Sequence, residues 1–98
     1  MNTIKEVLVS VEHLLETKGW CQNRLRNNSG AHCLIGAVVD TVRSGKFRTP
    51  SENALFYGTI AKLREALPYG ASLASFNDTK GRKLEDVLGV VRKARINA

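Results

Sequence analysis

Residues 19–38, GWCQNRLRNNSGAHCLIGAV, hold the only tryptophan of the chain, both of its cysteines and one of its two histidines. The middle of this stretch, Asn23–Gly30, is polar and rich in asparagine, so it predicts a loop. The apolar residues that follow predict a helix over about 31–43, ended by Ser44-Gly45. We interpret the stretch as a helix–loop–helix corner that folds around its tryptophan. A metal site and a cysteine active site are the alternatives.

Two further stretches carry complete helix start and stop signals. The first begins at the capping box Thr3–Glu6 and ends at Lys18-Gly19, because glycine accepts the left-handed cap. The second begins at the capping box Thr49–Glu52, with proline in the first helical position, and stops at Pro68. Its expected inner face is Ala54, Leu55, Gly58, Ile60, Leu63 and Leu67.

The last helix is expected to begin between residues 79 and 83, with its apolar stripe over 84–94. The segment Tyr69–Asp78 before it is expected to be irregular, with Leu73 and Phe76 packed inward; a short strand is the alternative. The sequence therefore predicts a compact all-α domain of four amphipathic helices with an irregular segment before the last helix.

The composition is that of an ordinary globular chain, with 98 residues, 43% hydrophobic and 24% charged, which predicts one domain over residues 1–98. No apolar run approaches the length of a membrane span, and the N-terminus lacks the apolar region of a secretory signal. We therefore expect a cytoplasmic protein without a membrane partner. In that compartment its two cysteines are expected to be free thiols.

The net charge of +6 is unevenly distributed. The first 16 residues hold one lysine and three glutamates, which leaves 14 basic and 6 acidic groups in residues 17–98. A basic body attracts polyanions, either nucleic acid or an acidic protein surface. Cations in loops and at helix ends are well placed to contact phosphates. The candidate binding residues are Arg24, Arg26, Arg43, Lys46, Arg48, Lys80, Arg82 and Lys83.

Three features weigh against a sequence-reading DNA-binding domain. No helix offers the arginine, asparagine and glutamine series of a major-groove reader. The connection between the first two helices is longer than the turn of a helix-turn-helix. The aromatic residues are few, so a base-stacking platform has little support. Nucleic-acid binding is therefore kept as the alternative to a protein partner.

Zinc is one candidate, because Cys21, His32 and Cys33 could supply three ligands, with His13 or Asp78 as a fourth. Structural zinc sites pair their ligands at short spacings such as C-x2-C. Here the two cysteines are far apart in the chain, and adjacent helical residues such as His32 and Cys33 diverge around the helix. We expect no metal and no other cofactor.

A cysteine nucleophile is the other chemical alternative. Cys33 is expected in the first turn of its helix, where the helix dipole lowers the pKa of a thiol. His13 or His32 would serve as the base, with Asn77 or Asp78 orienting the imidazole. A buried Cys33 that packs as a small apolar residue is the simpler interpretation. A domain of this size also leaves little room for a closed substrate pocket, so no catalytic residue is assigned.

Three of the expected helices carry a glycine inside their periodic region, at Gly36, Gly58 and Gly89. Each costs about 1 kcal/mol relative to alanine. Close approach of helix backbones is the expected reason, and a shallow groove for a partner or ligand is the alternative. Trp20, directly after the first helix, is interpreted as a lid over the core with its indole N–H bonded to a nearby carbonyl. An exposed Trp20 would instead be a binding anchor.

The motifs GW-x-Q (residues 19–22), C-L-x-G-A (33–37) and Phe-Asn-Asp (76–78) resemble those of a family of small uncharacterised bacterial and phage proteins, a domain of unknown function. The resemblance spans most of the chain, although the family more often has tryptophan in place of Phe76. It implies no activity. It implies one spatial cluster, either a folding signature or a binding pocket, made of Trp20, Gln22, Cys33, Gly36, Asn77 and Asp78.

The association of that family with phage and mobile elements favours a regulator or inhibitor that acts by binding. The leading hypothesis is a non-enzymatic module that docks on an acidic host protein or complex through its basic surface. A nucleic-acid-binding regulator is the first alternative, and a small-ligand or thiol-dependent site around Cys33 is the second. A homodimer is also open, because Ile35 and Val39 widen the apolar surface of the second helix.

Overall fold

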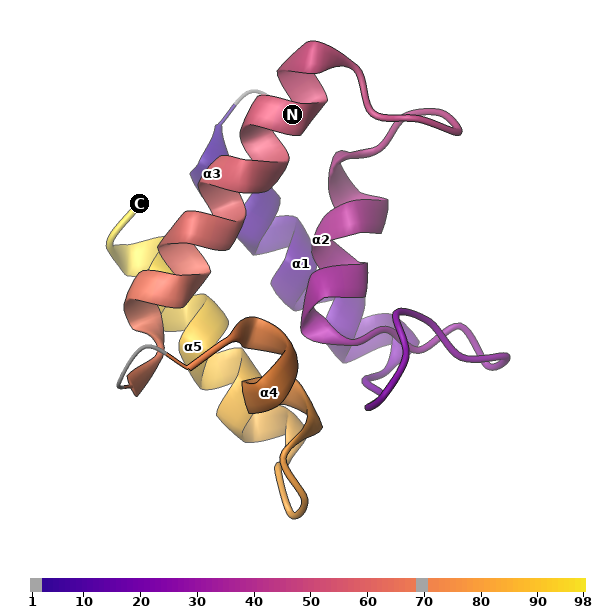
Figure 1. Ribbon diagram of the computed structural model, residues 1–98, viewed down its shortest axis with the longest axis vertical. Coiled ribbons are helices and arrows are strands. Elements are labelled where there is room, and N and C mark those ends of the chain that lie inside the picture. Colours follow the sequence, from indigo (N-terminus) through magenta and orange to yellow (C-terminus); the bar gives the residue numbers. More distant parts are fainter. Residues whose placement is uncertain (1–2, 69–70) are drawn as a thin grey trace.

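The computed structural model describes residues 3–68 and 71–98, and within them the protein is all α, with five helices and no strand (Figure 1). The all-α class is therefore confirmed, with one helix more than expected. No helix in these two ranges is long and apolar enough to span a membrane. The helices are α1 (Ile4–Lys18), α2 (Leu34–Val42), α3 (Pro50–Ala66), α4 (Leu73–Asp78) and α5 (Leu84–Ile96).

The four longer helices share one core. α1 contacts α2, α3 and α5, and α3 also contacts α2 and α5, while the short α4 packs against α2 (Figure 1). Side chains from all four longer helices are fully removed from water, and such burial is the main favourable term in folding. The largest of these are Leu8, Leu15, Leu34, Leu63 and Leu88.

The helix ends that the sequence marks most clearly are confirmed. The hydroxyl of Thr3 accepts the N–H of Glu6 at 3.1 Å at the start of α1. Both halves of the second capping box are formed at α3, since Thr49 Oγ1 accepts the N–H of Glu52 at 3.2 Å and Glu52 Oε1 accepts the N–H of Thr49 at 2.8 Å. Gly19, at φ 95°, is the C-cap of α1. These ends form correctly because each depends on residues three or four positions apart.

α2 begins three residues later than expected. The stretch before it does not coil, because His32 pairs in extended conformation with the chain after α1: its N–H donates to the carbonyl of Gly19 at 3.1 Å, and its carbonyl accepts from Cys21 at 3.0 Å. Cys33 is consequently the N-cap of α2, where its Sγ accepts the N–H of Gly36 at 3.2 Å. The segment from α1 to α2, residues 19–33, is called the first loop below.

The segment before the last helix is not irregular over its whole length. Residues 73–78 form α4, which is capped by Ser72 through a 3.1 Å bond from the N–H of Ser75. Tyr69, at the start of the expected irregular segment, lies outside the described residues, as does residue 70. The inward packing of Leu73 and Phe76 is confirmed, because they are 3% and 7% exposed.

The inner face of α3 and the glycines differ in part from expectation. Ala54 is exposed, whereas Thr59, which is not among the residues expected on that face, is fully buried. A Cβ on Gly36 would overlap the carbonyl of Leu25, so Gly36 does permit a close backbone approach, but the neighbour is a loop and not the second helix that was expected. Gly89 faces open space, and the packing explanation is wrong for it.

Candidate functional site

The side chain of Asn77, 2% exposed, joins α4 to the first loop and to the start of α2. Its Oδ1 accepts the indole Nε1–H of Trp20 at 2.7 Å and the backbone N–H of Leu34 at 3.0 Å. Its Nδ2 donates to the carbonyl of Cys21 at 3.1 Å and to Asp78 Oδ1 at 2.9 Å. A carboxamide has two acceptor and two donor positions, and all four are used here. Asn77 is therefore a structural node, with no capacity left for a ligand.

Two further contacts fasten the first loop to the segment after α4. The side-chain amide of Gln22 donates to the carbonyls of Asn77 at 3.0 Å and Thr79 at 2.9 Å. The backbone N–H of Asn23 donates to Asp78 Oδ1 at 2.8 Å. Asn23 adopts a left-handed φ of 67°, which asparagine tolerates better than most residues. These hydrogen bonds hold the first loop against residues that are distant from it in sequence.

The structure therefore brings together the residues that the family resemblance placed in one cluster. Trp20, Gln22, Asn77 and Asp78 are linked by the bonds above. Cys33 and Gly36 lie at the start of α2, beside Leu34, which also bonds to Asn77. Trp20 is half-buried against the core, and its indole bonds to a carbonyl oxygen, so its interpretation as a lid is confirmed.

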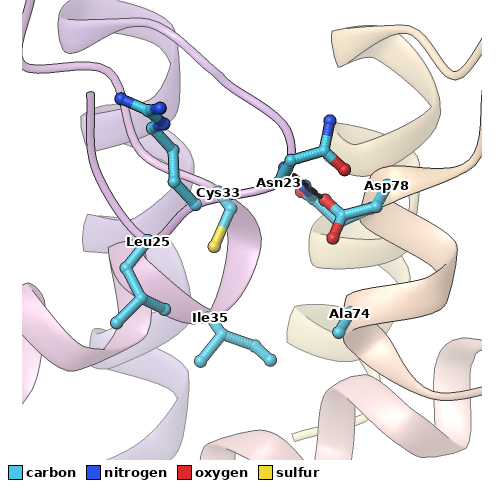
Figure 2. Close-up of a pocket in the computed structure, with 8 residues that line it drawn as sticks. Asn23, Leu25, Cys33, Ile35, Ala74 and Asp78 are labelled. Carbon is cyan, nitrogen blue, oxygen red and sulfur yellow. Dashed lines mark hydrogen bonds between the residues drawn. The ribbon is translucent and has the colours of Figure 1, made fainter.

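A cavity of about 230 Å³ opens beside this node, between the first loop and α4 (Figure 2). Leu25 and Ile35 line one side, Ala74 faces them from α4, and the sulfur of Cys33 points into the space between them (Figure 2). Leu25 and Ala74 were not among the candidate residues, because Leu25 lies in a polar loop and Ala74 in a segment expected to be irregular, whereas Ile35 was expected only as part of the wider apolar surface of α2. The lining is Asn23, Arg24, Leu25, Cys33, Ile35, Ala74, Asn77 and Asp78.

The two thiols of the first loop are not activated. Burial raises the pKa of Cys33, and this outweighs the hydrogen bond from the Gly36 N–H, which lowers it. Burial also raises the pKa of Cys21, followed by the proximity of Cys33. The expected lowering of the Cys33 pKa by the helix dipole is therefore wrong, since the sulfur is desolvated at the N-cap. Both groups are thiols and not thiolates at neutral pH, and only the thiolate is an effective nucleophile.

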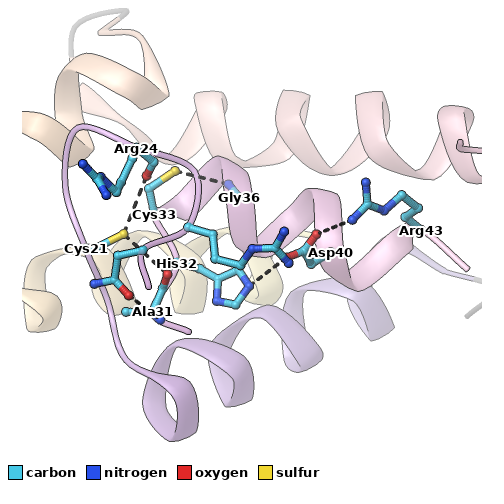
Figure 3. A network of polar contacts seen from close by, with 10 residues as sticks. Cys21, Arg24, Ala31, His32, Cys33, Gly36, Asp40 and Arg43 are labelled. Carbon is cyan, nitrogen blue, oxygen red and sulfur yellow. Dashed lines mark hydrogen bonds and ion pairs between the residues drawn. The ribbon is translucent and has the colours of Figure 1, made fainter. Parts of the chain in front are cut away.

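His32 is bound to a carboxylate and is not arranged as a base for Cys33. Its Nε2 lies 2.8 Å from Asp40 Oδ2, and Asp40 also pairs with Arg26 at 3.3 Å and Arg43 at 3.1 Å (Figure 3). His32 is 6% exposed, so Asp40 holds a nearly buried ring beside two arginines. Asp40 belongs to none of the motifs in the sequence, although a single acidic residue within an apolar helix is a usable signal of such a role.

The other groups considered for zinc or for general-base chemistry are dispersed. His13 is exposed on α1, and Asp78 accepts two hydrogen bonds beside the node. Nowhere in residues 3–68 and 71–98 do three or more histidine, cysteine, aspartate or glutamate side chains lie close enough to hold a metal ion.

The eight candidate basic residues do not form one patch. Arg26 and Arg43 converge on Asp40, as described above. Lys46 and Arg48 lie on the loop of residues 43–49, called the second loop, at the opposite end of α2 from the first loop (Figure 1). Arg48 stacks on Phe56, with 4.0 Å between the guanidinium carbon and the ring centroid.

The remaining four basic residues share one end of the molecule, because Gln22 and Asn23 fasten the first loop to the α4–α5 connection. We call this group the cationic end. The side chain of Arg82 packs on α4, with its guanidinium carbon 3.9 Å from the Phe76 ring centroid and its Nε donating to the Phe76 carbonyl at 2.8 Å. The cationic end consists of Arg24, Lys80, Arg82 and Lys83.

Comparison with known proteins gives one match. A model described as a family of unknown function (DUF6197) matches residues 1–97, and so includes the node, the cavity and the cationic end. No curated protein and no solved structure matches the chain.

Proposed function

This chain belongs to DUF6197, a family of unknown function, and we propose that it is a non-enzymatic binding module that docks on an acidic protein or complex. The motifs at residues 19–22, 33–37 and 76–78 resemble those of small bacterial and phage proteins, and this supports a regulator or inhibitor of phage type acting on a host target in the cytoplasm. The family assignment itself carries no activity, so the proposal depends on the geometry.

The cationic end is the observation that carries the proposal. Arg24 and Lys80 are exposed, come from loops more than fifty residues apart, and reach the same end of the molecule through the bonds of Gln22 and Asn23. Complementary charges steer association and suppress wrong partners. Cations on a loop that is already ordered lose less conformational entropy on binding than cations on a loose one.

The central polar groups offer little for catalysis, which supports a binding role. Every hydrogen-bonding position of Asn77 is used within the fold. Burial keeps Cys33 protonated, and His32 is directed at Asp40. An acyl-transfer site needs a nucleophile and a base in contact, and these three residues supply no such pair.

Charge reversal tests the proposal against a matched control. We expect Arg24→Glu/Lys80→Glu to lose at least tenfold in affinity for the captured partner, because like charges across an interface cost more than the 1.4 kcal/mol that tenfold represents. Lys5→Glu/Lys93→Glu changes the net charge equally on exposed helix positions and should bind as the wild type does. Affinity capture at moderate salt, followed by titration of the purified partner, measures both.

The proposal fails if the folded wild-type protein retains no partner from its source cells at moderate salt, or if both charge-reversed variants bind equally well. Circular dichroism of each variant establishes that the helices are intact.

A nucleic-acid target is favoured by one separate observation. Phe47 is 79% exposed at the tip of the second loop, between Lys46 and Arg48. An aromatic ring flanked by cations can stack on a base while its neighbours contact phosphates. If this surface binds RNA or single-stranded DNA, log K falls steeply with log salt, and Phe47→Ala weakens binding at every salt concentration. A flat salt response, or equal binding by Phe47→Ala, removes this alternative.

A further inference from the structure

The cavity beside the node has an apolar interior that the fold does not fill. Leu25 is 56% exposed although it is a large apolar residue in a loop, and it faces Ala74 of α4 across the opening, with Ile35 below (Figure 2). Exposed apolar side chains are common singly, but three that line one concavity form a place for an apolar group.

The size of the cavity restricts its occupant. Its volume of about 230 Å³ is below the roughly 300–1,000 Å³ of pockets that hold whole small-molecule ligands. It exceeds the roughly 150 Å³ of an apolar cavity that accepts benzene. One branched or aromatic side chain therefore fits, whereas a nucleotide or a comparable cofactor does not.

The walls are ordered before anything binds. Asn23 and Asp78 close one end of the cavity through their 2.8 Å hydrogen bond (Figure 2). The backbone of Leu25 is fixed as well, because its carbonyl accepts the N–H of Cys33 at 3.1 Å and lies directly against Gly36. A pocket that needs no ordering is the setting in which a single anchor side chain contributes much of a binding energy.

The charges around the opening are arranged asymmetrically. Arg24 lines one part of the cavity and belongs to the cationic end, while Asp78 lines another. Asp78 Oδ1 already accepts hydrogen bonds from Asn23 and Asn77, so its negative charge is held at that position. A carboxylate next to an inserted apolar group is therefore attracted on the Arg24 side and repelled on the Asp78 side.

We infer that this cavity receives one leucine- or phenylalanine-sized side chain of the acidic partner, and that Arg24 pairs with a carboxylate adjacent to that side chain. The inference rests on the proposed function and names the anchor of the same surface. It assigns Leu25, Ile35 and Ala74 to the contact, and it assigns charge selection to Arg24.

The experiment uses the full chain and two defined probes, N-acetylphenylalanine and its neutral amide, followed by NMR of methyl and backbone signals. We expect saturable shifts at Leu25, Ile35 and Ala74 with both probes. The carboxylate is expected to bind about two- to fivefold more tightly than the amide, as an exposed ion pair allows. Arg24→Gln should remove that preference, so that the carboxylate and the amide bind with equal affinity.

A variant that fills the cavity provides the second readout. Ala74 is exposed, so Ala74→Phe should fold and should abolish probe binding, and Ala61→Phe, at an exposed alanine of α3, is the matched control. Shifts that map elsewhere, or an unchanged affinity in Ala74→Phe, overturn the inference.

The two proposals fail separately. If Arg24→Glu/Lys80→Glu loses the protein partner and Ala74→Phe does not, the docking surface stands and the anchor cavity is wrong. If the probes bind as expected but no partner depends on the cationic end, the cavity stands as a side-chain site and the proposed function is wrong.

Discussion

Asn77 shows how a single side chain can organise a small domain. It satisfies the indole of Trp20 and an N–H at the start of α2 with one oxygen, and it holds Cys21 and Asp78 with its nitrogen. These partners lie up to 57 residues away in sequence. A buried polar group is tolerated only when its hydrogen bonds are made, so the four hydrogen bonds of the Asn77 side chain are expected to form together.

We predict that Asn77→Ala lowers the free energy of unfolding by about 2–4 kcal/mol, because it leaves several buried donors and acceptors without partners. Urea denaturation followed by Trp20 fluorescence and by circular dichroism measures the loss. Asn28→Ala, at an exposed position of the first loop, is the control and should stay within about 0.5 kcal/mol of the wild type. A loss in Asn77→Ala no larger than in this control would show that the node is dispensable.

Two helices show opposite uses of an interior glycine. In α2, the chain of the first loop passes so close to Gly36 that a Cβ would overlap the Leu25 carbonyl. In α5, Gly89 is exposed and faces open space. The helical pattern in the sequence is the same at both positions, so only the tertiary neighbours distinguish them.

We predict that Gly36→Ala destabilises the protein by about 1–3 kcal/mol, as expected for overpacking against backbone. Gly89→Ala should stabilise it by up to about 1 kcal/mol, because alanine is the better helix former. Thermal and urea unfolding of the two variants measure the pair, and each serves as the control for the other. Equal effects of the two substitutions would contradict the close approach at α2.

Across the whole molecule, the acidic first helix is largely neutralised internally. Glu12 of α1 lies 2.8 Å from both Arg92 and Arg95 of α5, and Glu16 adds a 3.6 Å contact to Arg92. The negative charge near the N-terminus and the positive charge of the last helix therefore offset one another. The unbalanced positive charge is left mainly in the loops, where the cationic end lies.

We expect the hydrogen bonds of the node to break only when the whole domain unfolds. We predict that the indole N–H of Trp20 exchanges with solvent only through global unfolding, because its bond to Asn77 joins the first loop to α4. Native-state hydrogen exchange in increasing urea measures this, and the amide of Phe47 in the second loop should exchange rapidly at all urea concentrations. Trp20 exchange that is insensitive to urea would show that the first loop opens locally.

The sequence alone determined the features that depend on near neighbours. The caps at Thr3, Thr49 and Gly19 and the all-α class follow from residues within one helical turn of each other, so local hydrogen bonding decides them. The family resemblance correctly grouped Trp20 with Asn77, although it left open whether the group was scaffold or pocket.

The start of α2, the contacts of Asp40 and the cavity depend on tertiary contacts that the sequence pattern does not contain. His32 pairs with the chain after α1, and α2 therefore begins later in the sequence than its apolar pattern predicts. Asp40 contacts His32 and two arginines. Leu25 and Ala74 line the same cavity from the first loop and α4. These outcomes depend on segments far apart in sequence whose relative positions are set by packing of the core. Periodicity along one helix carries no information about which loop will lie against it.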